Sequence, residues 1–205
     1  MSASTTLSAP HNDQALARHT AIAVFLAFAL AYFFSALIRA ITATLAPALT
    51  QEFTLSAADL GLLAGGYFFG FALTQLPLGA WLDRYGPRRV LLCFLSVAVL
   101  GCVAFALARS FWWLLAARVL CGIGVSACLM APLTGYRRWL QVGTQLRANS
   151  WMLMTGSLGM VASTLPVQWW MEHSASWGLL AGWRGLFVLL DGLPGLERKD
   201  GLVQV

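Results

Sequence analysis

The feature that most constrains this chain is a series of long apolar segments, each about as long as a lipid bilayer is thick. The hydrocarbon core of a bilayer measures about 30 Å, and an α-helix rises about 1.5 Å per residue, so a membrane-spanning helix needs about 20 mostly apolar residues. Five segments meet this requirement, at residues 20–45, 58–82, 90–108, 111–134 and 149–170. The sequence therefore predicts an all-α integral membrane bundle embedded in a lipid bilayer.

A sixth apolar segment, at residues 177–190, is incomplete as a membrane crossing. It contains Arg184 and several glycines, and an aspartate follows directly after it. We expect residues 20–190 to form one transmembrane bundle. On either side we expect a polar tail, 1–19 on the cytoplasmic side and 191–205 as a truncated or frameshifted end. The first apolar run is too long for the hydrophobic region of a signal peptide.

The composition agrees with a membrane protein and excludes several other classes. Hydrophobic residues make up 59% of the chain and charged residues only 10%, whereas an ordinary soluble domain carries about 25% charged residues. The net charge of +5 is dispersed between apolar runs, so we expect no nucleic-acid partner. The four cysteines lie inside apolar stretches without a CxxC pair, and we expect no disulfide framework, metal site or cofactor.

The arginines indicate the orientation of the loops, because short cytoplasmic loops retain Lys and Arg. Arginines precede the first predicted span and cluster between the second and third and between the fourth and fifth. The opposite loops carry the acidic residues Glu52, Asp59 and Glu172, with Arg109 as the main exception. The N-terminus is therefore predicted to be cytoplasmic, with the bundle in the plasma or inner membrane.

Small residues at regular spacing favour close packing of the helices. Small residues four positions apart let two helix backbones approach closely. The glycines that we assign to helix packing are Gly61, Gly65, Gly66, Gly70, Gly122 and Gly124. One interpretation of the second span is plain bundle packing; the other is a thin helix that slides or rocks.

Two arginines lie inside predicted spans, Arg39 in the first and Arg118 in the fourth. An intramembrane charge is unfavourable by several kcal/mol unless it faces a partner or a water-filled cavity, and both arginines lie roughly 10 Å from the outer surface. Arg39 shares a polar stripe of its helix with three other side chains, Tyr32, Ser35 and Thr42. Two guanidinium groups at one depth would make a seat for a carboxylate or phosphate. Alternatively, each arginine pairs with a carbonyl or an acid for structural reasons.

The loop between the second and third spans, GAWLDRYGPRR at residues 79–89, carries one acid among three arginines. Gly86 permits a sharp turn, and Asp83 can cap a helix or pair with a nearby arginine. The loop resembles the signature of the major facilitator superfamily, which has a glycine, then D-R-x-G, then basic residues between two spans. The matching positions are Gly79, Asp83, Arg84, Gly86, Arg88 and Leu91. Trp81, Leu82 and Pro87 depart from the usual pattern.

The fourth span supports the same resemblance. Residues 114–124, LLAARVLCGIG, are similar to the superfamily pattern L-x-x-x-R-x-x-Q-G-x-G, with Cys121 at the position of the glutamine. The resemblance implies that Arg118 takes part in proton transfer or conformational coupling, together with the loop residues Asp83 and Arg84.

The first two spans are similar to the anion:cation symporter branch of this superfamily. Arg39 is followed by Pro47 and then by QEFTLSAADLG at residues 51–61, and that branch begins the stretch with an Asp-Arg pair. Ile38 replaces the aspartate here. The resemblance implies an anion-binding role for Arg39, but it transfers no proton-carrying role to its neighbour.

The resemblance covers about residues 20–190 and implies the N-terminal half of a carrier that binds its solute between two six-helix halves. We expect ion-coupled transport of a small organic anion, with a proton as one coupling ion. The chain alone would be inactive, or would require a second half or a homo-oligomer. The alternative is a non-transporting bundle that self-associates or regulates a full-length carrier. We expect no enzyme activity, because no Asp, Glu or His lies in the middle of a span to serve an embedded nucleophile.

Overall fold

The computed structural model describes residues 18–140, 142–173 and 183–185. Every regular element in this part of the chain is helical, which confirms the predicted all-α fold. The helices are α1 (Arg18–Phe53), α2 (Ala57–Tyr85), α3 (Pro87–Ala106), α4 (Phe111–Val125), α5 (Ala127–Trp139), α6 (Val142–Ala162) and α7 (Leu165–His173). The predicted sixth segment and the two predicted tails lie mostly or wholly outside the described residues.

Four stretches of the described chain are long and apolar enough to cross a membrane: Thr20–Phe53, Ala57–Tyr85, Pro87–Ala106 and Phe111–Trp139. They correspond to the first four predicted spans. The fourth joins α4 and α5 through Ser126, which has helical dihedral angles and donates its hydroxyl to the Ile123 carbonyl at 2.7 Å. The first extends beyond the predicted end at residue 45 because the helix continues through Pro47 to Phe53.

The predicted fifth span, residues 149–170, is helical but divided between α6 and α7. Pro166 has no N–H group to continue the helical hydrogen bonding past Ala162. The two residues between the helices, Ser163 and Thr164, donate their hydroxyls to the carbonyls three positions earlier, at 2.6 and 2.7 Å. Thr44 of α1 donates to the Ser163 carbonyl at 2.8 Å. The break is therefore held against α1, and neither α6 nor α7 is among the four apolar stretches above.

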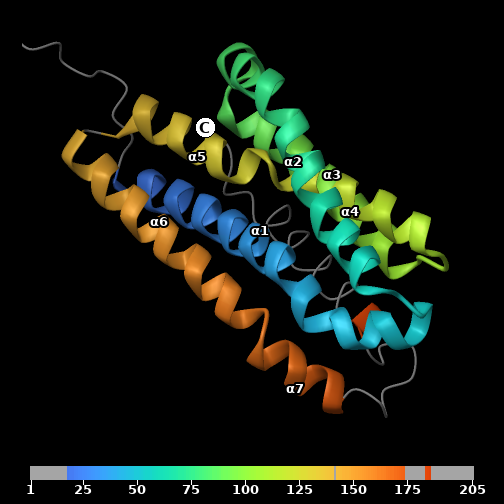
Figure 1. The fold of residues 1–205 in the computed structure, drawn as a ribbon. Helices are drawn as coiled ribbons and strands as arrows, with labels where there is room; N and C mark the ends of the chain where they lie inside the picture. The colour runs from blue at the N-terminus through green and yellow to red at the C-terminus, as the bar shows by residue number, and fades with distance from the viewer. Residues whose placement is uncertain (1–17, 141, 174–182, 186–205) are drawn as a thin grey trace, which may run out of the picture.

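The helices form two packed groups (Figure 1). α1 and α6 lie side by side and begin at the same end of the molecule, while α4 lies against both α2 and α3. α5 continues from α4 toward the end where α6 begins, and it contacts α3 and α1. This arrangement places the inner face of α1 opposite α2 and α4.

Glycines allow α4 to lie directly on its neighbours. A Cβ atom added at Gly70 of α2 would lie 2.2 Å from the backbone oxygen of Val119, and one at Gly122 would lie 2.0 Å from the backbone oxygen of Tyr67. A Cβ atom at Gly124 would lie 2.2 Å from a backbone nitrogen of α3. Since real Cβ contacts are essentially never below 3.0 Å, these positions require glycine.

Other glycines differ in their surroundings. A Cβ atom at Gly66 would lie 2.7 Å from a side-chain atom of α4, whereas Gly61 and Gly65 are exposed and have nothing within 4 Å. The contact between α1 and α6 uses Gly156 and Gly159, to which we assigned no packing role from the sequence. A Cβ atom at Gly159 would lie 2.4 Å from a backbone oxygen of α1.

Candidate functional site: an arginine-lined cavity

A cavity of about 200 Å³ lies between α1, α2 and α4. At about 30 Å³ per molecule, this volume equals that of about seven waters. Its lining combines two arginines, a threonine and a tyrosine with six apolar residues: Arg39, Ala40, Thr42, Ala43, Ala46, Leu60, Ala64, Tyr67, Phe68 and Arg118. The structure thus brings together the two intramembrane arginines that the sequence placed at one depth.

Arg118 is completely enclosed, with 1% of its surface exposed. Its Nη1 donates a hydrogen bond to the backbone carbonyl of Ile38 at 3.1 Å. Its guanidinium carbon lies 5.4 Å from the centre of the Tyr67 ring and 5.5 Å from that of Phe105, which are cation–π distances. The Nε atom has no hydrogen-bond partner among the described residues. Arg118 therefore has a structural contact, as the alternative interpretation expected, and retains an unused donor.

Arg39 lies next to the carbonyl that Arg118 binds and is half-buried. Its Nε atom and the Thr42 hydroxyl are both buried, and neither has a hydrogen-bond partner within the described part of the chain. Unpaired polar atoms in a buried position are unfavourable, and native structures usually satisfy them with water, an ion or a ligand. Arg39 and Thr42 thus present unsatisfied groups beside the cavity that they line.

The other two residues of the predicted polar stripe lie elsewhere. Ser35 is buried and is not part of the cavity lining. Tyr32 faces α6, where a Cβ atom at Gly156 would come within 2.3 Å of its ring. Helical periodicity placed these four side chains on one side of α1. That side is wide enough to face α6 at one edge and the cavity between α1, α2 and α4 at the other.

Tyr67 and Phe68 line the cavity, yet the sequence analysis did not select them. Tyr67 is buried and lies under Arg118, and its backbone is the point where Gly122 of α4 approaches α2. The available signal was a tyrosine inside the small-residue motif formed by Gly66 and Gly70. This signal does not identify a cavity residue, because an aromatic residue in an apolar span gives no indication of which helix it faces.

The cavity is suited to an anion. Among the described residues that line it, Arg39 and Arg118 are the charged ones, and none of these residues is a carboxylate. In an environment of low dielectric, the attraction between a guanidinium group and an anion is much stronger than in water. Within the described residues, no three His, Cys, Asp or Glu side chains gather closely enough to hold a metal ion.

The α2–α3 loop is a tight turn at the opposite end from the α1–α2 connection (Figure 1). Gly86 has a φ of 79°, a conformation that favours glycine, and it separates the end of α2 from Pro87 at the start of α3. Gly86 donates its N–H to the Leu82 carbonyl at 3.0 Å. Gly79 has nothing within 4 Å of an added Cβ atom. The turn fixes the angle between α2 and α3.

Charged residues connect this turn to the end of α5. Asp83 Oδ1 lies 3.7 Å from Arg138 Nη2, and their side chains are 80% and 41% exposed. The Arg84 guanidinium lies 5.4 Å from the ring centre of Tyr85, and Arg88 is exposed on the first turn of α3. An exposed ion pair at this distance contributes about 0–1 kcal/mol. It can therefore break and re-form readily.

The sequence of this chain matches a known protein family. The model of the Major Facilitator Superfamily matches residues 28–193, which is most of the chain. The chain belongs to the Major Facilitator Superfamily. The match confirms the resemblance inferred from the loop and from the fourth span, and together with the apolar helices it supports a multi-pass membrane protein.

Several transporters of known name are similar to this chain. The probable sulfoacetate transporter of Cupriavidus necator is 27% identical over 165 residues, covering 80% of this chain and 36% of the relative. The niacin transporter of Acinetobacter baylyi is 27% identical over 167 residues, covering 82% and 36%. The gallate transporter of Pseudomonas putida is 34% identical over 90 residues, covering 44% and 20%. The chain thus spans about a third of the length of the first two relatives.

Proposed function

We propose that this chain forms one wall of an ion-coupled, alternating-access carrier whose solute is a small organic anion bound between Arg39 and Arg118. The observation that carries the proposal is the cavity of about 200 Å³, lined by both guanidinium groups. In each of them the Nε atom has no partner among the described residues. The relatives named for sulfoacetate, niacin and gallate transport support the same class of solute.

The lining suggests how such a solute would bind. A carboxylate can accept hydrogen bonds from a guanidinium group in a planar, paired geometry, and the unpaired Thr42 hydroxyl can add another. The alanines of α1, with Leu60 and Phe68 of α2, would contact the apolar part of the solute. Because Nη1 of Arg118 is already bound to the Ile38 carbonyl, Arg39 is the better candidate for the principal anion contact.

The opposite wall and the conformational cycle would come from a second six-helix half, as in the superfamily fold. In this scheme Arg118 couples solute binding to helix movement, since it connects α4 to the α1 carbonyl beside Arg39. The Asp83–Arg138 contact would open and close at the cytoplasmic end. None of the described residues that line the cavity is a carboxylate, and we assign proton coupling to groups outside this lining.

The charge distribution supports an N-terminus on the cytoplasmic side of a cell membrane. The arginines of the α2–α3 turn and of the end of α5 lie together, as the contact between Asp83 and Arg138 requires. α1 also begins at this end of the bundle (Figure 1). Under the rule that short cytoplasmic loops retain basic residues, this end is the cytoplasmic one.

A second candidate function is a non-transporting bundle that associates with another copy or with a full-length carrier. Gly61 and Gly65 favour it, because both are exposed on α2 with nothing within 4 Å and could admit another helix. Gly65→Leu should then weaken association of the chain in a bilayer without altering anion binding. Unchanged association in this variant would argue against the second candidate.

The test of the main proposal is binding of labelled benzoate and of inorganic phosphate to the chain in lipid nanodiscs. Hydrogen bonds to charged groups contribute about 1.5–3 kcal/mol, so Arg39→Ala should weaken binding of the preferred anion by about tenfold or more. Arg39→Lys should retain part of the affinity. Arg89→Ala, at an exposed arginine of α3, is the control and should bind normally. Equal affinity in Arg39→Ala and the parent protein would reject an anion-binding site at Arg39.

Transport is tested separately in proteoliposomes, with and without a proton gradient. Binding without uptake would mean that a second half is needed. Saturable uptake abolished by Arg39→Ala would mean that the chain assembles into a carrier by itself. Neither measurement depends on the other, so the anion seat and the transport activity can fail independently.

A further inference from the structure

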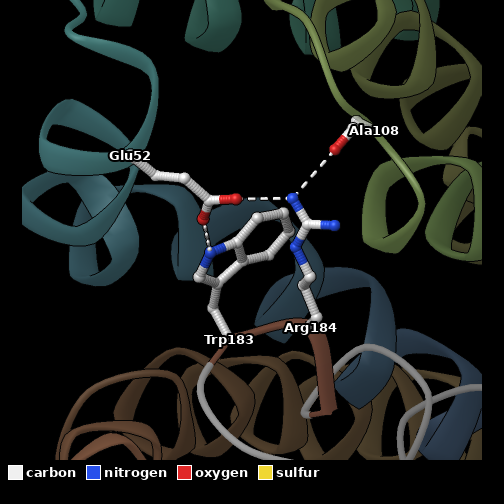
Figure 2. Close-up of polar contacts among 4 residues, drawn as sticks. All are labelled: Glu52, Ala108, Trp183 and Arg184. Atoms are coloured by element: carbon white, nitrogen blue, oxygen red, sulfur yellow. Dashed lines mark hydrogen bonds and ion pairs between the residues drawn. The ribbon is translucent and has the colours of Figure 1, made fainter. Parts of the chain in front are cut away.

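The side chains of Glu52, Trp183 and Arg184 gather at the C-terminal end of α1 (Figure 2). Glu52 belongs to the last turn of α1, whereas Trp183 and Arg184 are far along the chain. Glu52 Oε2 accepts a hydrogen bond from Trp183 Nε1 at 2.7 Å, and Glu52 Oε1 pairs with Arg184 Nη2. The same Nη2 donates to the backbone carbonyl of Ala108, between α3 and α4, at 3.1 Å.

Aromatic packing supports this polar cluster. The Arg184 guanidinium carbon lies 5.0 Å from the centre of the Trp183 ring. Trp183 is buried, and its ring meets that of Phe105 edge to face with centroids 5.5 Å apart. The side chains of Glu52 and Arg184 are each 39% exposed, so water screens the pair only in part. Both carboxylate oxygens are used, and the tryptophan fixes the arginine from one side.

We infer that Glu52, Trp183 and Arg184 form a latch that ties the end of α1 to the connection between α3 and α4. The carboxylate is carried by α1, and the carbonyl belongs to the segment that leads into α4. Arg184 therefore bridges the end of α1 and the connection between α3 and α4, which are distant in sequence. Loss of Glu52 removes the α1 end of the bridge, and loss of Arg184 removes the bridge itself.

The latch joins α1 to the segment that leads into α4, and these two helices carry the cavity arginines. Arg39 lies on α1 and Arg118 on α4, and Arg118 already contacts α1 at Ile38. The latch is a second attachment, about 15–20 Å along the helices at about 1.5 Å per residue. With both attachments closed, α1 cannot swing away from α4. With the latch open, the end of α1 can pivot about the Arg118 contact, and the cavity wall can widen.

The inference is tested by measuring the distance between the two latched segments, independently of any transported solute. Spin labels are placed at Gln51→Cys and Arg109→Cys in the full chain in a bilayer, with exposed Cys93 replaced by serine. We expect a single narrow distance distribution in this parent. Glu52→Ala should shift it to longer distances and broaden it.

A control pair at the other end of the bundle separates latch opening from unfolding. Labels at Tyr85→Cys and Arg137→Cys, both exposed and adjacent to the Asp83–Arg138 contact, should give the same distribution with and without Glu52→Ala. If the control pair also changes, Glu52→Gln replaces Glu52→Ala, because it keeps the shape and an acceptor for Trp183. An unchanged distance between the latch labels in the folded variant would overturn the inference.

The energetic coupling of the partners gives a further criterion. Because Glu52 and Arg184 act through one bridge, the double variant Glu52→Ala/Arg184→Ala should shift the distance no further than either single variant. Trp183→Phe keeps the ring beside Phe105 but removes the Nε1 donor, and it should give a smaller shift. Additive shifts in the double variant would mean separate structural contacts and would reject a common latch.

Discussion

The closest approach between two helices in this protein predicts the effect of adding a single methyl group. In Gly122→Ala, the new Cβ atom of α4 would lie 2.0 Å from the Tyr67 backbone oxygen, where 3.0 Å is the shortest contact that occurs in practice. The two helices would have to separate by about 1 Å even to reach that limit. Overpacking of this kind is unfavourable by about 1–3 kcal/mol, which exceeds the gain of up to about 1 kcal/mol from replacing a helical glycine by alanine.

The matched control is Gly65→Ala, the same change on α2 where an added Cβ atom meets nothing within 4 Å. This variant should be neutral or slightly stabilising, since only helix propensity changes. Thermal unfolding in detergent, followed by tryptophan fluorescence, measures both. At about 2–4 °C per kcal/mol, Gly122→Ala should unfold about 2–12 °C below Gly65→Ala, because both variants share the gain in helix propensity. Equal transition temperatures for the two variants would refute the close contact between α2 and α4.

Three further predictions concern the cavity and the α2–α3 turn. Arg118→Lys keeps a positive charge but loses the planar donor arrangement, so the affinity for benzoate in nanodiscs should fall by about tenfold. An unchanged affinity would show that Arg118 does not belong to the anion-binding site. Thr42→Val removes an unpaired buried hydroxyl without changing the shape, so binding should weaken about fivefold while the unfolding temperature is maintained or raised. A loss of stability instead would assign Thr42 a structural role. Asp83→Asn should change the free energy of unfolding by less than about 1 kcal/mol but slow uptake by a complete carrier. Normal uptake would mean that the α2–α3 turn only sets the orientation of the chain in the membrane.

The membrane fold and the family could be predicted from the sequence because both depend on local patterns. Apolar runs long enough for a bilayer determine the spans wherever they occur, and four of the five appear as continuous apolar helices or helix pairs. The fifth could not be predicted in detail. Its division at Ser163 depends on Pro166 and on a hydrogen bond from Thr44 of α1, and a hydropathy average detects neither.

The candidate site was predictable in part. A charge within an apolar helix requires a cavity or a partner, so Arg39 and Arg118 could be selected from the sequence, and their common depth follows from helical rise. Helical periodicity indicates which residues share a side, but it does not indicate which helix faces that side. Tyr32 therefore proved to contact α6, while Tyr67 proved to lie under Arg118.

The sequence by itself determined which segments are apolar enough to span a membrane, which arginines lie within those segments and which family the chain resembles, because these properties follow from residue types and their spacing. Only the tertiary structure decided which glycines are packing contacts, which side chains enclose the cavity and which residue pairs with Glu52. Gly61 and Gly122 are both glycines in apolar helices, yet one faces open space and the other a carbonyl oxygen. The physical reason is that packing joins residues that are distant along the chain, and their proximity depends on how all the helices fit together.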